Sequence, residues 1–153
     1  MDLILWRHAD AAVDGDDGDD LSRPLTAKGE RQAERMAEWL NRRLAHSTRI
    51  VVSPALRCQQ TAKALARKSQ TVAELAPGAS VVELLRVVRW PDAAEPVLVV
   101  GHQPTLGLVA SLALAGIAQP WSIRKAAVWW IRHRLRDPEG QVVLQAMQSP
   151  DCL

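Results

Sequence analysis

Four residues suited to binding and transferring phosphate stand at, or a few positions beyond, the ends of short apolar segments. They are Arg7, His8, Arg57 and His102. A guanidinium group forms paired hydrogen bonds with phosphate oxygens, and an imidazole nitrogen can attack phosphorus. Two of each, brought together, would hold a tetrahedral dianion and stabilise the charge that develops during its transfer. The residue types therefore point to phosphoryl transfer, provided that the fold gathers them in one place.

The segments that must position these residues alternate between strand and helix patterns. Short runs rich in Leu, Ile and Val predict strands at 2–6, 49–52 and 96–100, with a further short strand at 70–74. Apolar spacing and capping signals predict helices at 27–44, 54–68, 80–88 and 104–115. Thr26 and Ser53 are the expected N-caps of the first two helices.

The end of the chain carries a different pattern. Two apolar segments, 126–131 and 141–146, flank an Asp-Pro-Glu-Gly stretch at 137–140, which predicts an antiparallel hairpin. Together with the preceding alternation, this predicts an α/β fold: a three-layer α/β/α sandwich with a mostly parallel sheet and an antiparallel edge hairpin. Ligands of such folds bind outside the carboxyl ends of the strands. Six polar residues are expected at that rim, namely Arg7, His8, Ser53, Arg57, Glu74 and His102.

Length and composition limit the organisation of the chain. Its 153 residues, 48% of them apolar, predict a single domain over 1–153 without a separate cap domain. No apolar run approaches the roughly 18 to 20 residues that span a bilayer, and charges begin at Asp2, so neither a membrane span nor a signal peptide is expected. Cys58 and Cys152 lie far apart, which favours free thiols and a cytoplasmic location.

The charged residues favour an anionic ligand. Arginine accounts for 15 of the 19 basic residues, and its planar fork suits phosphate. Nucleic acid is not expected as a partner, because no RRM, zinc-finger or KH signature is present and the basic stretch 124–136 alternates like a strand. Residues 14–20 contain five Asp and no base. An EF-hand would need Glu at the twelfth position, where Leu25 stands, so a solvated loop is expected.

Four separated blocks of the sequence resemble the histidine phosphatase superfamily, whose fold is phosphoglycerate mutase-like. In chain order they are Leu5-Trp6-Arg7-His8-Ala9-Asp10, Arg23-Pro24-Leu25-Thr26 with Gly29, Val52-Ser53-Pro54-Ala55-Leu56-Arg57 with Gln60-Thr61-Ala62, and Val100-Gly101-His102-Gln103-Pro104. Within the superfamily, the Arg-Pro-Leu-Thr stretch, the short chain and the closing residues 147–153 look most like the SixA-type phosphohistidine phosphatases.

This resemblance implies a role for each matched residue. His8 would be the nucleophile and form a transient phosphohistidine, while Arg7, Arg57 and His102 would bind the phosphoryl oxygens. Neither a metal nor another cofactor is implied. In the wider superfamily an acidic residue protonates the leaving group, and Glu74 occupies the matching stretch. The sequence departs from the usual Arg-His-Gly at Ala9, which adds a methyl group next to the pocket.

Five further residues each have two interpretations. Arg23 either anchors the acidic loop or contacts the substrate, and Asp10 either orients its loop through hydrogen bonds or joins a metal site. The loop role is favoured for Asp10, because no further ligands stand at metal spacing. Ser53 either caps a helix, the favoured reading, or offers its hydroxyl to the site. Gln103 is a candidate substrate or loop contact, and Trp90 either borders the site or packs at an edge.

Two other kinds of phosphate site are excluded by spacing. Cysteine phosphatases of the Cys-x5-Arg type need Arg six positions after the cysteine, where Ala64 follows Cys58. The stretch 101–107 contains two Gly but lacks the Lys-Ser/Thr pair of a P-loop.

Three functions follow, in order of preference. The first is hydrolysis of phosphohistidine on a protein partner through phosphorylated His8. The second is hydrolysis of a small phosphorylated metabolite at the same site, and the third is a non-catalytic phosphate-binding module. Only about one short helix fits between Glu74 and the strand at 96–100, which leaves little chain to roof the site. An open site would admit a histidine displayed on a folded protein.

Overall fold

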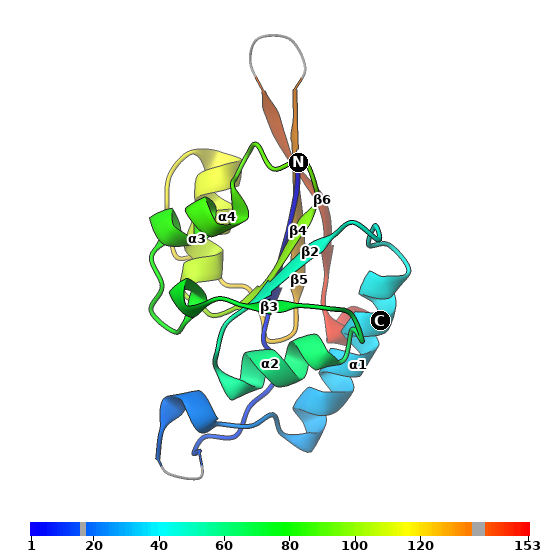
Figure 1. The fold of residues 1–153 in the computed structure, drawn as a ribbon, viewed down its shortest axis with the longest axis vertical. Coiled ribbons are helices and arrows are strands. Elements are labelled where there is room, and N and C mark those ends of the chain that lie inside the picture. The colour runs from blue at the N-terminus through cyan, green and yellow to red at the C-terminus, as the bar shows by residue number, and fades with distance from the viewer. Residues whose placement is uncertain (16–17, 136–139) are drawn as a thin grey trace.

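The computed structural model describes residues 1–15, 18–135 and 140–153, which form an α/β fold around a six-stranded sheet (Figure 1). The strands are β1 (Asp2–Arg7), β2 (Arg49–Val52), β3 (Gln70–Thr71), β4 (Val97–Gly101), β5 (Val128–Arg134) and β6 (Gln141–Gln148). The helices are α1 (Ala27–Asn41), α2 (Leu56–Lys63), α3 (Val81–Val88) and α4 (Thr105–Ala115). Short 3₁₀ turns form η1 (Asp20–Ser22), η2 (Ala73–Leu75) and η3 (Pro150–Cys152).

The sheet has the order β3-β2-β4-β1-β5-β6. Strands β1 to β4 are parallel, whereas β5 and β6 run antiparallel at one edge. The predicted α/β class, the mostly parallel sheet and the edge hairpin are thus confirmed. The hairpin extends to one end of the molecule, and η1 lies at the other (Figure 1).

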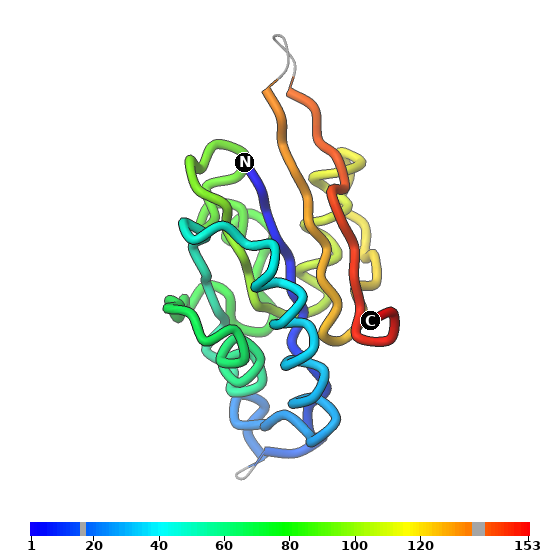
Figure 2. Tube along the Cα trace, turned by 90° about the vertical axis from the view of Figure 1, so that its right-hand side faces the viewer, coloured from blue at the N-terminus to red at the C-terminus, as the bar shows by residue number. Residues whose placement is uncertain are grey.

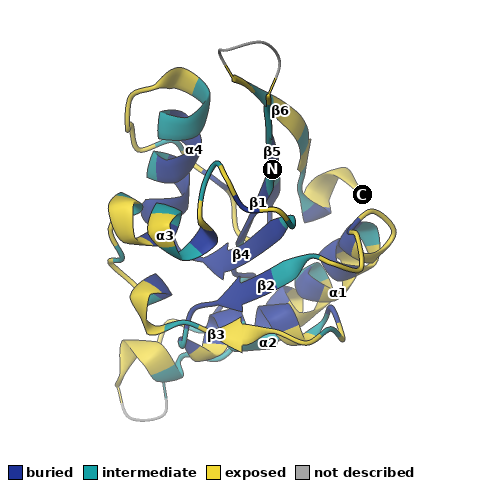
Figure 3. Ribbon diagram, turned by 45° about the horizontal axis from the view of Figure 1, so that its top comes forward, coloured by how far each residue is buried: buried dark blue, intermediate teal, exposed yellow. Residues whose placement is uncertain are grey.

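Helices cover both faces of the sheet, so the three predicted layers are present. Figure 2 shows α1 in front of the strands and α4 behind them. Alternate residues of β1 feed the two cores: Ile4 and Trp6 pack with α1 and α2, and Leu3 and Leu5 pack with α3 and α4. The central strands are buried, and the edge strands β3 and β6 are more exposed (Figure 3).

Several predicted boundaries were wrong. The helix expected at 27–44 ends at Asn41, and the strand expected at 126–131 spans Val128–Arg134. The helix expected at 54–68 spans only Leu56–Lys63, because the chain reverses at Ala66, which has a φ of 52°. The strand expected at 70–74 ends at Thr71, where the chain turns into η2 and buries Leu75 in the core. The turn expected at 137–140 falls largely outside the described residues.

The start of α1 fixes the loop that follows β1. Thr26 is the N-cap as predicted, and its Oγ1 accepts a hydrogen bond from the Gly29 amide at 3.0 Å. A Cβ at position 29 would collide with the Asp10 carbonyl oxygen, so glycine is required for this close approach. The loop carrying His8 is therefore held against the first turn of α1.

In the part of the chain that the structure describes, none of the helices combines the length and the apolar character needed to cross a bilayer.

Candidate active site

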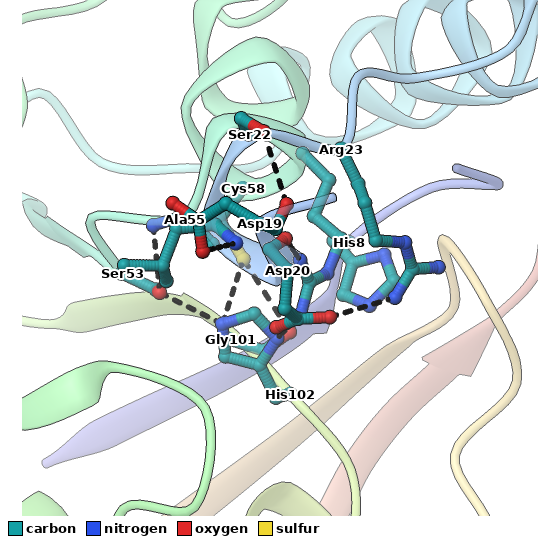
Figure 4. A network of polar contacts seen from close by, with 12 residues as sticks. His8, Asp19, Asp20, Ser22, Arg23, Ser53, Ala55, Cys58, Gly101 and His102 are labelled. Carbon is teal, nitrogen blue, oxygen red and sulfur yellow. Dashed lines mark hydrogen bonds and ion pairs between the residues drawn. The ribbon is translucent and has the colours of Figure 1, made fainter. Parts of the chain in front are cut away.

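Pairing of β1 with β4 aligns the strand ends that carry the predicted site residues. Arg7 lies opposite Gly101, and the His8 amide donates to the Gly101 carbonyl at 3.2 Å. The rings of His8 and His102 consequently lie side by side, with centroids 5.4 Å apart and planes tilted by 55° (Figure 4). Arg57, in the first turn of α2, brings its Nη2 within 3.4 Å of His102 Nδ1. The rim predicted from the strand order thus gathers two imidazoles and two guanidinium groups.

The His8 ring makes a contact that selects its tautomer. Nδ1 lies 2.8 Å from the Ala9 carbonyl oxygen. Since that oxygen can only accept, Nδ1 carries the proton and Nε2 carries the lone pair. The Ala9 amide in turn donates to Thr61 Oγ1 at 3.0 Å, and Thr61 donates to the Arg57 carbonyl at 2.7 Å. The lone pair of the His8 ring therefore lies on Nε2, and hydrogen bonds join its loop to α2.

Both imidazoles of the site are uncharged at neutral pH. Burial lowers the pKa of His8 from 6.5 to about 4, and the positive charges of Arg57 and Arg7 add to the effect. Burial, followed by the charge of Arg57, lowers the pKa of His102 to about 3. A neutral imidazole is the form that can attack phosphorus.

These lowered pKa values predict that the protein loses stability as the pH falls from 7 to 5. In that window the unfolded chain takes up protons on His8 and His102 near pH 6.5, whereas the folded protein does not, so protons favour unfolding. The expected loss is on the order of 2 kcal/mol for each imidazole. Urea unfolding at a series of pH values measures it. A His8→Gln variant should lose about half of the pH dependence, and a flat profile in the wild type would contradict the assignment.

The two arginines carry buried donors without protein acceptors. Arg7 Nη1 donates to the Ile123 carbonyl at 2.8 Å, but the buried Nε atoms of Arg7 and Arg57 have no hydrogen-bond partner among the described residues. Arg57 is only 4% exposed. Buried donors without acceptors are costly, and both belong to a cluster of positive charge, which favours an anion as the ligand of this site.

Asp20 is a site residue that the sequence analysis missed, since residues 14–20 were interpreted only as a solvated loop. Its Oδ2 accepts from Arg57 Nη2 at 3.1 Å, its carbonyl accepts from Arg57 Nη1 at 2.8 Å, and its Oδ1 accepts from Arg23 Nη1 at 3.0 Å. Figure 4 shows this carboxylate beside His8 and His102. Hydrogen bonds from Arg23 and Arg57 lower the pKa of Asp20, so a negative charge engages the donors that a phosphate would use.

Replacing Asp20 with Asn is therefore expected to tighten oxyanion binding. A bound phosphate or tungstate must displace the carboxylate from Arg57, and Asn retains the shape without the charge. The expected gain is on the order of tenfold, or about 1.4 kcal/mol, measured by calorimetric titration with tungstate. Asp14→Asn is the matched control, because Asp14 is exposed in the same acidic segment. Equal affinities for the two variants would show that Asp20 does not compete with the anion.

Asp10 and Arg23 hold the loops around the site. Asp10 accepts hydrogen bonds from Thr26 at 2.7 Å and Lys125 at 2.9 Å, as expected of a carboxylate that orients its loop. Arg23 Nε donates to the Ala12 carbonyl at 2.7 Å and so anchors the loop, while its contact with a substrate stays a prediction. No group of three or more His, Cys, Asp or Glu residues is arranged to hold a metal ion in the described residues.

Gln103 and Trp90 contact other parts of the protein. Gln103 Nε2 donates to the Trp121 carbonyl at 2.8 Å and Oε1 accepts from the Gly107 amide at 2.9 Å, so this side chain serves as a loop contact. Trp90 packs edge-on against His133, with ring centroids 5.9 Å apart. Because His133 lies at the far end of β5 from the site, edge packing was the correct alternative for Trp90.

The favoured role of Ser53 was wrong. Helix α2 begins at Leu56 with Ala55 as N-cap, and Ala55 makes no side-chain capping bond. The Ser53 hydroxyl instead lies 2.7 Å from His102 Nε2. This happens because the Ser53 amide continues the β2–β4 pairing by donating to the Val100 carbonyl at 3.1 Å, which places residue 53 beside residue 102.

Glu74 follows β3, an edge strand of the sheet. Its carboxylate is on η2, after β3, and is exposed. Strand β3 is three places from β1 in the sheet, or roughly 14 Å at ordinary strand spacing. Among the described residues, no hydrogen bond or ion pair joins Glu74 to His8 or His102. Its role as an acid stays a prediction.

Comparisons of the sequence and of the fold with known proteins point to the same family. The family model described as histidine phosphatase superfamily (branch 1) matches residues 3–84. An uncharacterised protein of Picosynechococcus is 36% identical over 140 residues, covering 86% of this chain and 85% of that protein. Phosphohistidine phosphatase SixA of Escherichia coli is 34% identical over 121 residues, covering 73% of this chain and 74% of that protein. The solved structure of the protein histidine phosphatase SixA complexed with tungstate has a TM-score of 0.77 and 27% identity, covering 99% of this chain and 98% of that one.

Proposed function

Because the chain belongs to the histidine phosphatase superfamily, we propose that it hydrolyses phosphohistidine on a protein partner through a covalent intermediate at His8. The observation that carries this proposal is the His8 ring itself, with Nδ1 committed to the Ala9 carbonyl and a pKa of about 4. That ring is neutral at physiological pH and has its lone pair on Nε2.

The reaction proceeds in two displacements at phosphorus. First, His8 Nε2 forms a bond to phosphorus while the bond from phosphorus to the substrate imidazole breaks, and the departing imidazole takes a proton from solvent or an acid. Water then attacks phosphorus, the bond to His8 breaks, and phosphate leaves with His8 neutral again. Arg7 and Arg57 neutralise the phosphoryl oxygens in both steps.

The proposal of a protein substrate rests on how little chain surrounds the site. Between η2 and β4 stands one helix, α3, which buries Leu84 and Val88 in the core and lies beside α4 on one face of the sheet (Figure 1). This segment contributes to a layer of the sandwich instead of adding a cap. A histidine on a folded partner could then approach the strand ends.

A direct comparison of substrates tests the function. Phosphate release is measured from a phosphohistidine-bearing protein domain and from a panel of small phosphate esters, with wild-type protein and a His8→Ala variant. The proposal expects a kcat/KM for the protein substrate at least one hundred-fold (~10²) above that for the best ester. A preference for a small ester would establish the metabolite phosphatase instead. Oxyanion binding without turnover of any substrate would establish the binding module.

Glu74→Gln gives a separate test of the acid. The imidazole leaving group has an ordinary pKa near 6.5, so it needs little help from an acid, whereas a phenolate with a pKa near 10 needs much more. We expect the variant to slow an aryl phosphate by roughly tenfold or more, and phosphohistidine by less than about threefold. Steady-state kcat/KM values for both substrates measure this. Glu83→Gln, on the exposed face of α3, is the control, and equal slowing of both substrates would rule out Glu74 as the acid.

A further inference from the structure

The Ser53 hydroxyl is buried between two partners. Ser53 is 0% exposed. Its Oγ accepts a hydrogen bond from the Ala55 amide at 3.2 Å and lies 2.7 Å from His102 Nε2. The Cys58 Sγ lies 3.4 Å from the same ring nitrogen, and its thiol donates to the Gly101 carbonyl oxygen at 3.8 Å. The Ser53 hydroxyl is therefore the donor available to Nε2.

The hydroxyl proton of Ser53 favours one tautomer of His102. If Nε2 carried the ring proton, Ser53 Oγ would accept from both Nε2 and the Ala55 amide, and its own proton would have only the Cys58 sulfur, a weak acceptor, beside it. A buried hydroxyl proton without a strong acceptor is costly. If Nε2 carries the lone pair, Ser53 donates to it at 2.7 Å. The ring proton then resides on Nδ1, which has no acceptor in the hydrogen bonds of the described residues and can donate to a bound oxyanion.

One contact favours the opposite tautomer, but it is the weaker one. Arg57 Nη2 lies 3.4 Å from His102 Nδ1 and would donate to a lone pair there. That distance is beyond the usual range for N–H···N or N–H···O bonds, whereas 2.7 Å to Ser53 is well within it. The same Nη2 also donates to Asp20 Oδ2 at 3.1 Å, so Arg57 does not depend on His102 for a partner.

The tautomer matters because Nδ1 is the nitrogen on the Arg57 side of the ring. A lone pair there would face the oxygens of a phosphoryl dianion and repel them, whereas an N–H there donates to them. We propose that Ser53 is a positioning residue: by donating to His102 Nε2 it holds the proton on Nδ1, so that His102 presents a hydrogen-bond donor to the phosphoryl group. This inference deepens the proposed function and rests on it for the identity of the bound group.

Nitrogen-15 NMR of the ligand-free protein tests the tautomer without any substrate. In imidazole-labelled wild-type protein at pH 7, long-range proton–nitrogen correlations should show His102 protonated at Nδ1. In Ser53→Ala the donor to Nε2 is lost, and the proton should move to Nε2, where Nδ1 can accept from Arg57. Ser53→Thr retains the hydroxyl and should keep the wild-type tautomer. A wild-type ring protonated at Nε2, or a tautomer unchanged in Ser53→Ala, would overturn the proposal.

Oxyanion binding supplies the second measurement. Tungstate affinity should fall by about tenfold in Ser53→Ala and be restored in Ser53→Thr, as measured by calorimetry. Ser111→Ala is the control for loss of a buried hydroxyl, because Ser111 is also 0% exposed and bonds within the α4 region. Equal losses in the Ser53→Ala and Ser111→Ala variants would contradict a role through His102. Should the protein fail to hydrolyse phosphohistidine while these results hold, the proposed substrate alone would be wrong.

Discussion

Replacing His8 with Ala is expected to reduce turnover of phosphohistidine by on the order of 10⁴-fold or more. The substitution removes Nε2, the atom that we propose attacks phosphorus. Water is a much weaker nucleophile than a neutral imidazole and cannot replace it at a comparable rate. Binding of the oxyanion should survive, since Arg7, Arg57 and His102 remain. The expected signature is thus a lost kcat with tungstate affinity retained within a few-fold.

Rapid-quench experiments with a ³²P-labelled substrate measure the intermediate directly. Wild-type protein should carry label that is stable to base and labile to acid, as a phosphorus–nitrogen bond is, and mass spectrometry should locate it on His8. His46→Ala is the matched control, because His46 is exposed on the surface. Substantial turnover by His8→Ala would exclude the covalent mechanism, even if the substrate proved correct.

Most of the fold and the centre of the site were predictable from local sequence patterns. Strands β1, β2 and β4 are short apolar runs, and the polar site residues stand at or a few positions beyond their ends. Parallel strands bring such ends to one edge of the sheet. The pairing of Arg7 with Gly101 agrees with that rule. The sequence alone therefore predicts that four residues lie together: Arg7, His8, Arg57 and His102.

The errors arise where distant contacts outweigh local signals. Helix α2 stops early although no glycine marks its end. The end of the helix is held by two hydrogen bonds to the segment that follows α1. Asn41 Nδ2 donates to the Leu65 carbonyl at 3.0 Å, and Arg67 Nη1 donates to the Ala45 carbonyl at 3.0 Å. These hydrogen bonds fix the reversal of the chain at Ala66. They involve Asn41 and Ala45, so the local sequence of residues 54–68 does not predict them.

Asp20 was missed for a similar reason. Five aspartates in seven residues resemble a solvated loop, and composition alone does not say which of them turns inward. The choice depends on η1, where Asp19 caps the turn through the Leu21 amide at 3.2 Å and Asp20 is thereby directed toward Arg57. One sequence feature could have identified Asp20. It stands three residues before Arg23, and Arg23 opens a block that resembles the family.

Arg57→Ala is expected to lower kcat/KM for the phosphorylated substrate by roughly 10²- to 10³-fold, the range found when one preorganised oxyanion donor is removed. Arg57→Lys should recover only part of this, because an ammonium keeps the charge but not the planar fork. Arg86→Ala, an exposed arginine on α3, is the control. Steady-state kinetics and tungstate titration measure the losses, and a full rescue by lysine would show that charge alone is needed.

Combining Arg57→Ala with Asp20→Asn separates competition from simple charge repulsion. If Asp20 weakens anion binding by engaging Arg57, its removal should improve tungstate affinity in the wild type but much less when Arg57 is absent. The expected coupling is on the order of 1 kcal/mol, typical of residues in direct contact. If Asp20 acts only through the general field of the site, the Asn substitution should give the same gain in both backgrounds. Additive effects would therefore refute a competition that works through the 3.1 Å contact between Arg57 Nη2 and Asp20 Oδ2.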